Sequence, residues 1–236
     1  MKTFIAAALS LFVVSFSQAQ LAIEVGAKGS YNSTWLFNKN ISDQGDIQDY
    51  AMGWGKNYGL GATVYFGAFG IALDVLQGNH VGGYQGVFLG EDYTSSVDLK
   101  TLNIPLMVKL RGESGGYIEL GVQMTRVSNA EYTFDSASDA IDLIYGGTSD
   151  VTDKYSKSHN SAILGFGASV KPIPNVPLAL NLGVRFQYGF SNAGGVDALG
   201  FGLDNSLLYA EPETTNAVSG GIMAGLTFTI QTPKKD

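Results

Sequence analysis

The chain has 236 residues, a length typical of one domain, and it contains 31 glycines. Only 15% of its residues are charged and 45% are hydrophobic, a composition too apolar for a disordered chain. The net charge of −7 argues against general nucleic-acid binding. The chain has no cysteine and two histidines, which excludes thiolate and histidine-rich metal sites, and we expect no cofactor.

The first 19 residues have the pattern of a secretory signal peptide. Lys2 precedes an apolar run over residues 3–16, and Ser17 and Ala19 are the small residues of a cleavage site. We expect cleavage after Ala19 and one domain over residues 20–236. No later run reaches the 18 or so apolar residues of a membrane-spanning helix, so a mature chain that crosses a membrane must do so with strands.

Eight segments then alternate between apolar and polar residues with the period of a β-strand. They cover residues 21–30, 57–66, 69–78, 99–111, 116–127, 160–171, 177–190 and 217–231. One face of these segments holds 38 positions without a charge, and the opposite face is rich in glycine. Glycine weakens a water-facing strand, but inside a narrow barrel it leaves room for long side chains.

This pattern predicts an all-β fold, an eight-stranded antiparallel transmembrane β-barrel whose apolar face contacts lipid. A soluble secreted barrel that turns its apolar face inward around a ligand is the alternative. The connections alternate in length: those at 67–68, 112–116 and 172–176 are short, and those at 31–56, 79–98, 128–159 and 191–216 are long. Short periplasmic turns and four long extracellular loops are typical of outer-membrane barrels.

The three short turns also predict the pairing of the strands. A two-residue turn at 67–68 places Phe66 opposite Phe69. Centring the next hairpin on residue 114 pairs Lys109 with Glu119, and centring the third on residue 174 pairs Val170 with Leu178. A slip of one residue would turn every apolar side chain to the wrong face, so the agreement of three hairpins supports the prediction.

Four stretches of the sequence point to a known family. They are VGAKGSYNSTW (25–35), LNIPLMVKL (102–110), GYIELGVQ (116–123) and AGLTFTI (224–230). Together they resemble the PorT-like, porin-type outer-membrane β-barrel family of Bacteroidota, and the resemblance covers the chain after the signal peptide. It implies an integral outer-membrane protein, and some members of the family are linked to protein secretion and export to the cell surface.

The glycine-rich face carries charges that would point into the barrel. Three are acidic and three are basic: Glu24, Asp74, Glu119, Lys28, Lys109 and Arg185. Because a buried charge is costly unless it is paired, we predict a paired network that plugs the lumen, with a salt bridge from Lys109 to Glu119. Arg111 and Lys171 are expected at the periplasmic rim, outside this network. The alternative is a narrow porin-like channel for small solutes.

The long connections contain most of the acidic residues. Counted as 31–56, 79–96, 128–159 and 191–216, they hold 15 acidic residues and four lysines. They form either a solvated surface or one that divalent ions bridge to neighbouring lipid or polysaccharide. Two of them also contain apolar runs, a helix expected over 138–147 with Ser138 as its N-cap and an irregular run over 196–209.

These runs either pack together over the barrel mouth or form a docking surface for envelope or secretion-machinery proteins. The candidate partner-facing residues are Ile141, Leu143, Ile144, Tyr145, Leu207, Leu208 and Tyr209. Catalytic residues are sparse: His159 has Ser158 and Ser161 nearby and His80 lies at another strand end, but the sequence places no acid beside them. We predict a non-enzymatic monomer in the outer membrane, with outer-membrane lipid or lipopolysaccharide and envelope proteins as partners.

Overall fold

The computed structural model describes residues 21–173, 176–195 and 213–231. The signal peptide expected over residues 1–19 lies outside the described residues, as do Leu207, Leu208 and Tyr209. In the described part, ten strands form one antiparallel sheet. The strands are β1 (Leu21–Phe37), β2 (Asp49–Ala51), β3 (Gly53–Phe66), β4 (Phe69–Phe88), β5 (Glu91–Arg111), β6 (Gly116–Ser136), β7 (Gly147–Asp150), β8 (Ser158–Val170), β9 (Leu178–Gly189) and β10 (Asn216–Gln231).

Short helical segments lie between some of these strands. They are α2 (Lys39–Ser42), α3 (Asp139–Tyr145) and the 3-10 helices η1 (Gly45–Ile47) and η2 (Thr152–Lys154). The helix expected over 138–147 is therefore present as α3, with Ser138 at its N-cap position, although the serine side chain makes no capping hydrogen bond. Within the described residues, no helix is both long and apolar enough to span a membrane.

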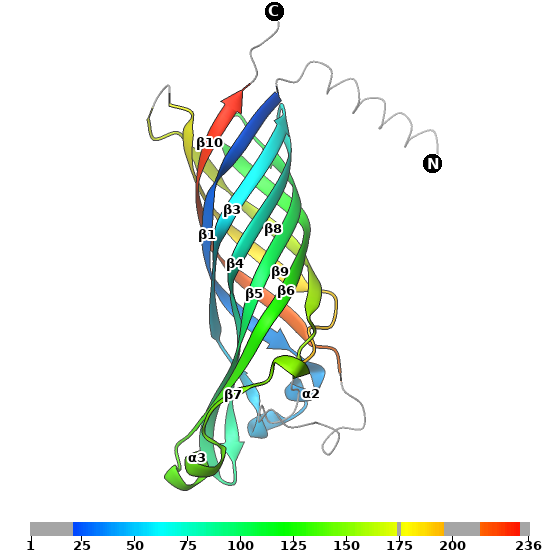
Figure 1. The fold of residues 1–236 in the computed structure, drawn as a ribbon, viewed down its shortest axis with the longest axis vertical. Helices are drawn as coiled ribbons and strands as arrows, with labels where there is room; N and C mark the ends of the chain where they lie inside the picture. Colours follow the sequence, from blue (N-terminus) through cyan, green and yellow to red (C-terminus); the bar gives the residue numbers. More distant parts are fainter. Residues whose placement is uncertain (1–20, 174–175, 196–212, 232–236) are drawn as a thin grey trace, which may run out of the picture.

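The strand pairings follow chain order around one long axis (Figure 1). They run from β1 through β3, β4, β5, β6, β8 and β9 to β10, and β10 pairs with β1 along its whole length. The short strands β2 and β7 pair with β4 and β6. Both described chain ends lie at one end of the sheet, the turn end, and α2 and α3 lie toward the other, the hairpin end (Figure 1).

The register agrees with two of the three predicted hairpins. Phe66 is opposite Phe69, and Lys109 is opposite Glu119. The third prediction is wrong by two residues, because Val170 is opposite Leu180 rather than Leu178. Prolines at 172 and 177 have no N–H to donate to a ladder, so the connection between β8 and β9 is longer than the sequence pattern indicates. A shift of two residues keeps the apolar face on the same side.

The two faces of the sheet are chemically opposite. Apolar side chains from every long strand are exposed on the outer face, among them Leu60, Leu73, Leu106, Leu120 and Ile222. The inner face is buried and mostly polar near the turn end. The soluble barrel considered above is wrong, because it requires these apolar side chains to point inward.

Three of the strands continue far beyond the predicted segments. β4, β5 and β6 have 20, 21 and 21 residues, and only Leu89 and Gly90 separate β4 from β5. The long loop expected over 79–98 is therefore a continuous hairpin, and much of the connection over 128–159 is strand, helix and the short β7. We call residues 81–99 and 129–155, together with β2, the extension. It projects at the hairpin end (Figure 1).

The extension has the opposite polarity to the rest of the sheet, which is why the sequence pattern failed to predict its strands. Its interior holds a cluster of buried apolar and aromatic side chains that includes Tyr84, Leu99, Tyr132 and Phe134. A register shift between Lys100 and Thr101 marks the change. Hydrophobic burial thus operates on the inner face here, as in a water-soluble protein.

Candidate functional site

An ion-pair network crosses the space enclosed by the strands near the turn end. Asp74 of β4 accepts hydrogen bonds from Lys28 of β1 and from Arg185 of β9, the second at 3.4 Å. Arg185 also donates to Glu119 Oε1 of β6 at 2.8 Å. β4 and β9 are four pairings apart whichever way the pairings are followed, so this network joins opposite strands of the sheet.

The predicted salt bridge between Lys109 and Glu119 does not form. The two residues face each other across β5 and β6, but the Lys109 ammonium lies 3.6 Å from the centroid of the Tyr117 ring. Arg185 holds the carboxylate instead: its guanidinium donates to both Glu119 and Asp74, and its planar fork of donors suits carboxylates. The aromatic ring offers Lys109 a cation–π contact in exchange.

Arg111 belongs to this interior, although the sequence placed it at the rim outside the network. Its guanidinium donates to Glu24 Oε1, and it lies 4.1 Å from the centroid of the Tyr65 ring. All six predicted residues of the network are on the inner face. Five of them form ion pairs, in one group of Lys28, Asp74, Arg185 and Glu119 and a second of Glu24 with Arg111, whereas Lys109 contacts the Tyr117 ring.

Glycines make room for these side chains, as the sequence indicated. A methyl group on Gly165 would lie 2.6 Å from Glu119 Oε1, and one on Gly70 would lie 2.7 Å from the Tyr65 ring. At Gly183, it would lie 2.7 Å from the Tyr117 hydroxyl. Contacts this short would force the charged and aromatic side chains to move, so the small residues are a condition for the network.

A second polar layer lies between the network and the extension. Asn103 donates to Asn57 Oδ1 at 2.9 Å, and Gln123 donates to Asn103 Oδ1 and Gln187 Oε1, both at 3.1 Å. Gln187 in turn donates to Ser161 Oγ at 3.0 Å. Sequence reasoning missed this layer because it considered only charges. The polar face of the alternation was the signal that could have found it.

The two histidines do not form a catalytic arrangement with the candidate serines. His80 Nε2 lies 2.9 Å from the Trp35 carbonyl oxygen, and His159 is buried. Ser158 is on the opposite face from His159, and Ser161 is held by Gln187. The described residues include no group of three metal-ligating side chains that could hold an ion.

The extension supplies a second candidate site at its tip. Of the predicted partner-facing residues on α3, Ile141 is buried in the apolar cluster, whereas Leu143 is 88% and Ile144 73% exposed. The prediction for Ile141 is wrong because its position on the helix turns it toward β6. Tyr145 packs edge-on against Phe88, with ring centroids 5.5 Å apart.

The turn between β4 and β5 adds to this exposed apolar surface. Leu89 is 74% exposed and has a positive φ of 54°, which is unusual for a leucine. We call Leu89, Leu143 and Ile144 the apolar tip. Below the tip, Tyr93 is buried inside the extension. It donates a hydrogen bond to the Ile47 carbonyl at 3.0 Å, and burial raises the pKa of Tyr93 to about 12.

The profile of a family described as "Outer membrane protein beta-barrel domain" matches residues 16–194. The chain belongs to this family. It is an outer-membrane β-barrel protein, with a belt of apolar side chains on the outer face of its sheet. None of the curated proteins compared with it matches its sequence.

Several solved structures resemble the chain at low sequence identity. Neisserial surface protein A shares 13% identity at a TM-score of 0.39, covering 88% of this chain and 97% of that one. Ail, the attachment invasion locus protein of Yersinia pestis, shares 11% at 0.41, covering 88% and 99%. The outer membrane protease OmpT from Escherichia coli shares 10% at 0.39, covering 91% and 98%.

Proposed function

We propose that the protein is a closed eight-stranded barrel of the PorT-like type, exported through an N-terminal signal peptide. The support for closure is the pairing of β10 with β1 over residues 216–231, which completes a ring with β3, β4, β5, β6, β8 and β9. Because outer-membrane barrels place short turns in the periplasm, the turn end faces the periplasm and the extension faces the cell exterior.

Its lumen is plugged and the protein is not an enzyme. Ion pairs connect side chains of β1, β4, β6 and β9 across the centre of the ring. The layer of Asn103, Gln123 and Gln187 lies next to them toward the hairpin end. Transport of a small solute would require both layers to part at once. The arrangement supports a structural core with charges that satisfy one another.

The function supported best is recognition of a protein partner by the extension. The apolar tip is the observation that carries this proposal, because a soluble surface seldom exposes three large aliphatic side chains together. Residues 81–99 and 129–153 around it contain nine acidic residues and no lysine or arginine. The partner is therefore an envelope or secretion-machinery protein whose surface has an apolar centre and a basic rim.

Photocrosslinking in whole cells tests this function. A photoreactive amino acid in place of Leu143 should give a discrete adduct, and the same group in place of Thr94, which is exposed on the extension outside the tip, should not. The adduct should be lost when Leu89 and Ile144 are changed to serine, and it should weaken as salt is raised. An adduct that is insensitive to both changes, or no adduct at Leu143, would contradict the proposal.

A further inference from the structure

The outer face of the sheet changes character along a single row of residues. Tyr58 is opposite Gln77, Gln77 is opposite Leu102, and Leu102 is opposite Arg126 in the register of β3 to β6. Toward the turn end, the exposed residues of these strands are apolar. Toward the hairpin end the exposed residues of β5 and β6 are polar, and β3 has Lys56 followed by the aromatic Trp54, so this row marks the edge of the apolar belt.

Three basic side chains stand at this edge. Lys56, Lys100 and Arg126 are exposed on the outer face of β3, β5 and β6. Asn79 of β4 lies between the two lysines, because it is opposite Lys100 and its side chain accepts the Lys56 backbone N–H at 3.0 Å. Two strand spacings separate Lys56 from Lys100, which is about 10 Å. The three cations therefore span four neighbouring strands.

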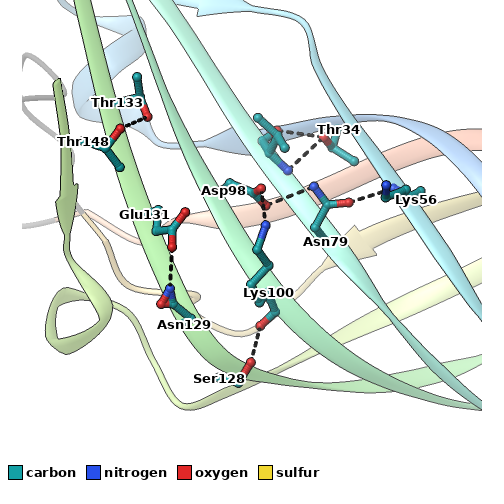
Figure 2. A network of polar contacts seen from close by, with 11 residues as sticks. Thr34, Lys56, Asn79, Asp98, Lys100, Ser128, Asn129, Glu131, Thr133 and Thr148 are labelled. Atoms are coloured by element: carbon teal, nitrogen blue, oxygen red, sulfur yellow. Dashed lines mark hydrogen bonds and ion pairs between the residues drawn. The ribbon is translucent and has the colours of Figure 1, made fainter.

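Polar contacts fix the middle of this group, as Figure 2 shows. Asp98 Oδ2 accepts a hydrogen bond from Lys100 Nζ at 2.6 Å, and Asp98 Oδ1 accepts one from Asn79 at 3.0 Å. Lys56 and Arg126 form no ion pair with any described residue. Asp98 thus neutralises Lys100, and the positive charges of Lys56 and Arg126 remain available to bind an anion.

A hollow of about 510 Å³ lies between these side chains. Lys56, Lys100 and Asn79 line it together with the Asp98 carboxylate, Tyr58 borders it on the side of the apolar belt, and Arg126 stands outside it. The hollow is therefore polar, with two cations and one carboxylate, and its border toward the belt is aromatic. A ligand that matches the hollow has an anionic head, which lies among the cations, and an apolar body, which lies toward the turn end on the apolar belt.

An aromatic pair borders the basic group. Tyr31 of β1 is opposite Lys56, and Trp54, two residues before Lys56 on the outer face of β3, stacks on Tyr31 with ring centroids 5.2 Å apart. Tyrosine and tryptophan are the usual residues of a membrane interface. The pair therefore places the basic group on β3 to β6 at the height of the interface.

We propose that Lys56, Lys100 and Arg126 form a binding site for the phosphorylated sugar headgroup of an outer-leaflet lipid. The cations contact the phosphates, Asn79 and Ser128 offer hydrogen bonds to the sugar, and the acyl chains lie on the belt below Tyr58. The inference rests on the membrane orientation proposed above, which puts this edge at the outer leaflet. The acidic residues Asp98 and Glu131 lie one row of residues closer to the hairpin end, beyond the lipid headgroups.

The test measures equilibrium binding of fluorescent bis-phosphorylated lipid A to the full chain folded in detergent. The test variant carries Lys56→Gln, Lys100→Gln and Arg126→Gln. The control variant carries Lys39→Gln, Lys154→Gln and Lys171→Gln, which removes the same charge from exposed positions elsewhere. The test variant should lose affinity by about tenfold for each phosphate contact removed, and the control should bind like the parent protein.

Each other outcome overturns the site. Equal binding by both variants, equal loss in both, or undiminished binding of the same lipid without phosphates contradicts phosphate recognition by these residues. A soluble sugar phosphate that binds as tightly as the lipid contradicts the lipid assignment. Heat-modifiable gel mobility is measured in parallel: its absence in the parent protein defeats the barrel proposal, whereas a heat-modifiable protein that does not bind defeats this inference alone.

Discussion

β5 passes through two environments that reverse the usual placement of apolar residues. From Leu102 to Arg111 its outward side chains are apolar and its inward ones include Asn103 and Lys109. From Glu91 to Leu99 the buried inward side chains are Tyr93, Ser95, Val97 and Leu99, of which only Ser95 is polar, and the outward ones are polar. One strand thus contains a membrane-protein half and a water-soluble half, and the change occurs within two residues.

The comparison shows that the surroundings, rather than the strand, decide which face is apolar. In lipid the outer face gains nothing from being polar, and the interior must satisfy its own polar groups. In water the same sheet needs an apolar interior, which Tyr84, Tyr132 and Phe134 supply. The basic edge at Lys100 lies between the two halves. The same substitution should therefore change the unfolding free energy by different amounts in the membrane half and in the water-soluble half.

The largest effect is expected where the interior of the membrane half loses a charge. Arg185→Leu would leave Asp74 and Glu119 buried without their shared cation, which should cost about 3–5 kcal/mol of unfolding free energy. Urea unfolding of the protein in phospholipid vesicles, followed by heat-modifiable mobility, measures the loss.

Gln187→Leu is the matched control, since Gln187 is on the same inner face of β9 two residues away. It removes hydrogen bonds to neutral partners and should cost about 0.5–1.5 kcal/mol for each bond lost. If Arg185→Leu is no more damaging than Gln187→Leu, the charges do not hold the interior together.

The next largest change in unfolding free energy is expected from a charge placed on the outer face of β5, where the membrane half and the water-soluble half can be compared directly. Leu106→Arg puts a charge in the middle of the apolar belt and should cost about 2–4 kcal/mol. Thr94→Arg makes the corresponding change on the exposed outer face of the extension and should stay within about 0.5 kcal/mol. The same urea titration measures both variants. Similar small losses would show that Leu106 does not face lipid.

The strands of the membrane half could be predicted from the sequence, because strict alternation with an uncharged face leaves few other structures. The extension could not, for two reasons. The polarity of β5 inverts between Lys100 and Leu102, and the irregularity that places Ser128 between the partners of Lys100 and Thr101 changes which residues of β6 point inward. The alternation of apolar and polar residues alone therefore predicts that each strand ends at that point.

Membership of the interior network was also predictable for the six charges on the glycine-rich face, because it follows from which face a residue occupies, but Arg111 was missed. The partners were not. Arg185 and Asp74 are 111 positions apart and lie on opposite strands, so their contact depends on the width of the interior rather than on any register. The same holds for Arg111, whose long side chain reaches inward to Glu24 from the end of β5.

The smallest effect tests whether the glycine-rich face is a packing requirement of the membrane half. Gly165→Ala would bring a methyl group within 2.6 Å of Glu119 Oε1, an atom that Arg185 already holds, and should cost about 1–3 kcal/mol. Gly29→Ala is the control, because its methyl group would lie 3.5 Å from the Asn57 carbonyl oxygen, an ordinary contact. Gly29 lies in a strand, where alanine also restricts the unfolded chain, so this variant should be neutral or slightly stabilising. Equal urea midpoints for the two variants would mean that Glu119 moves aside freely and that the interior is looser than a packed plug.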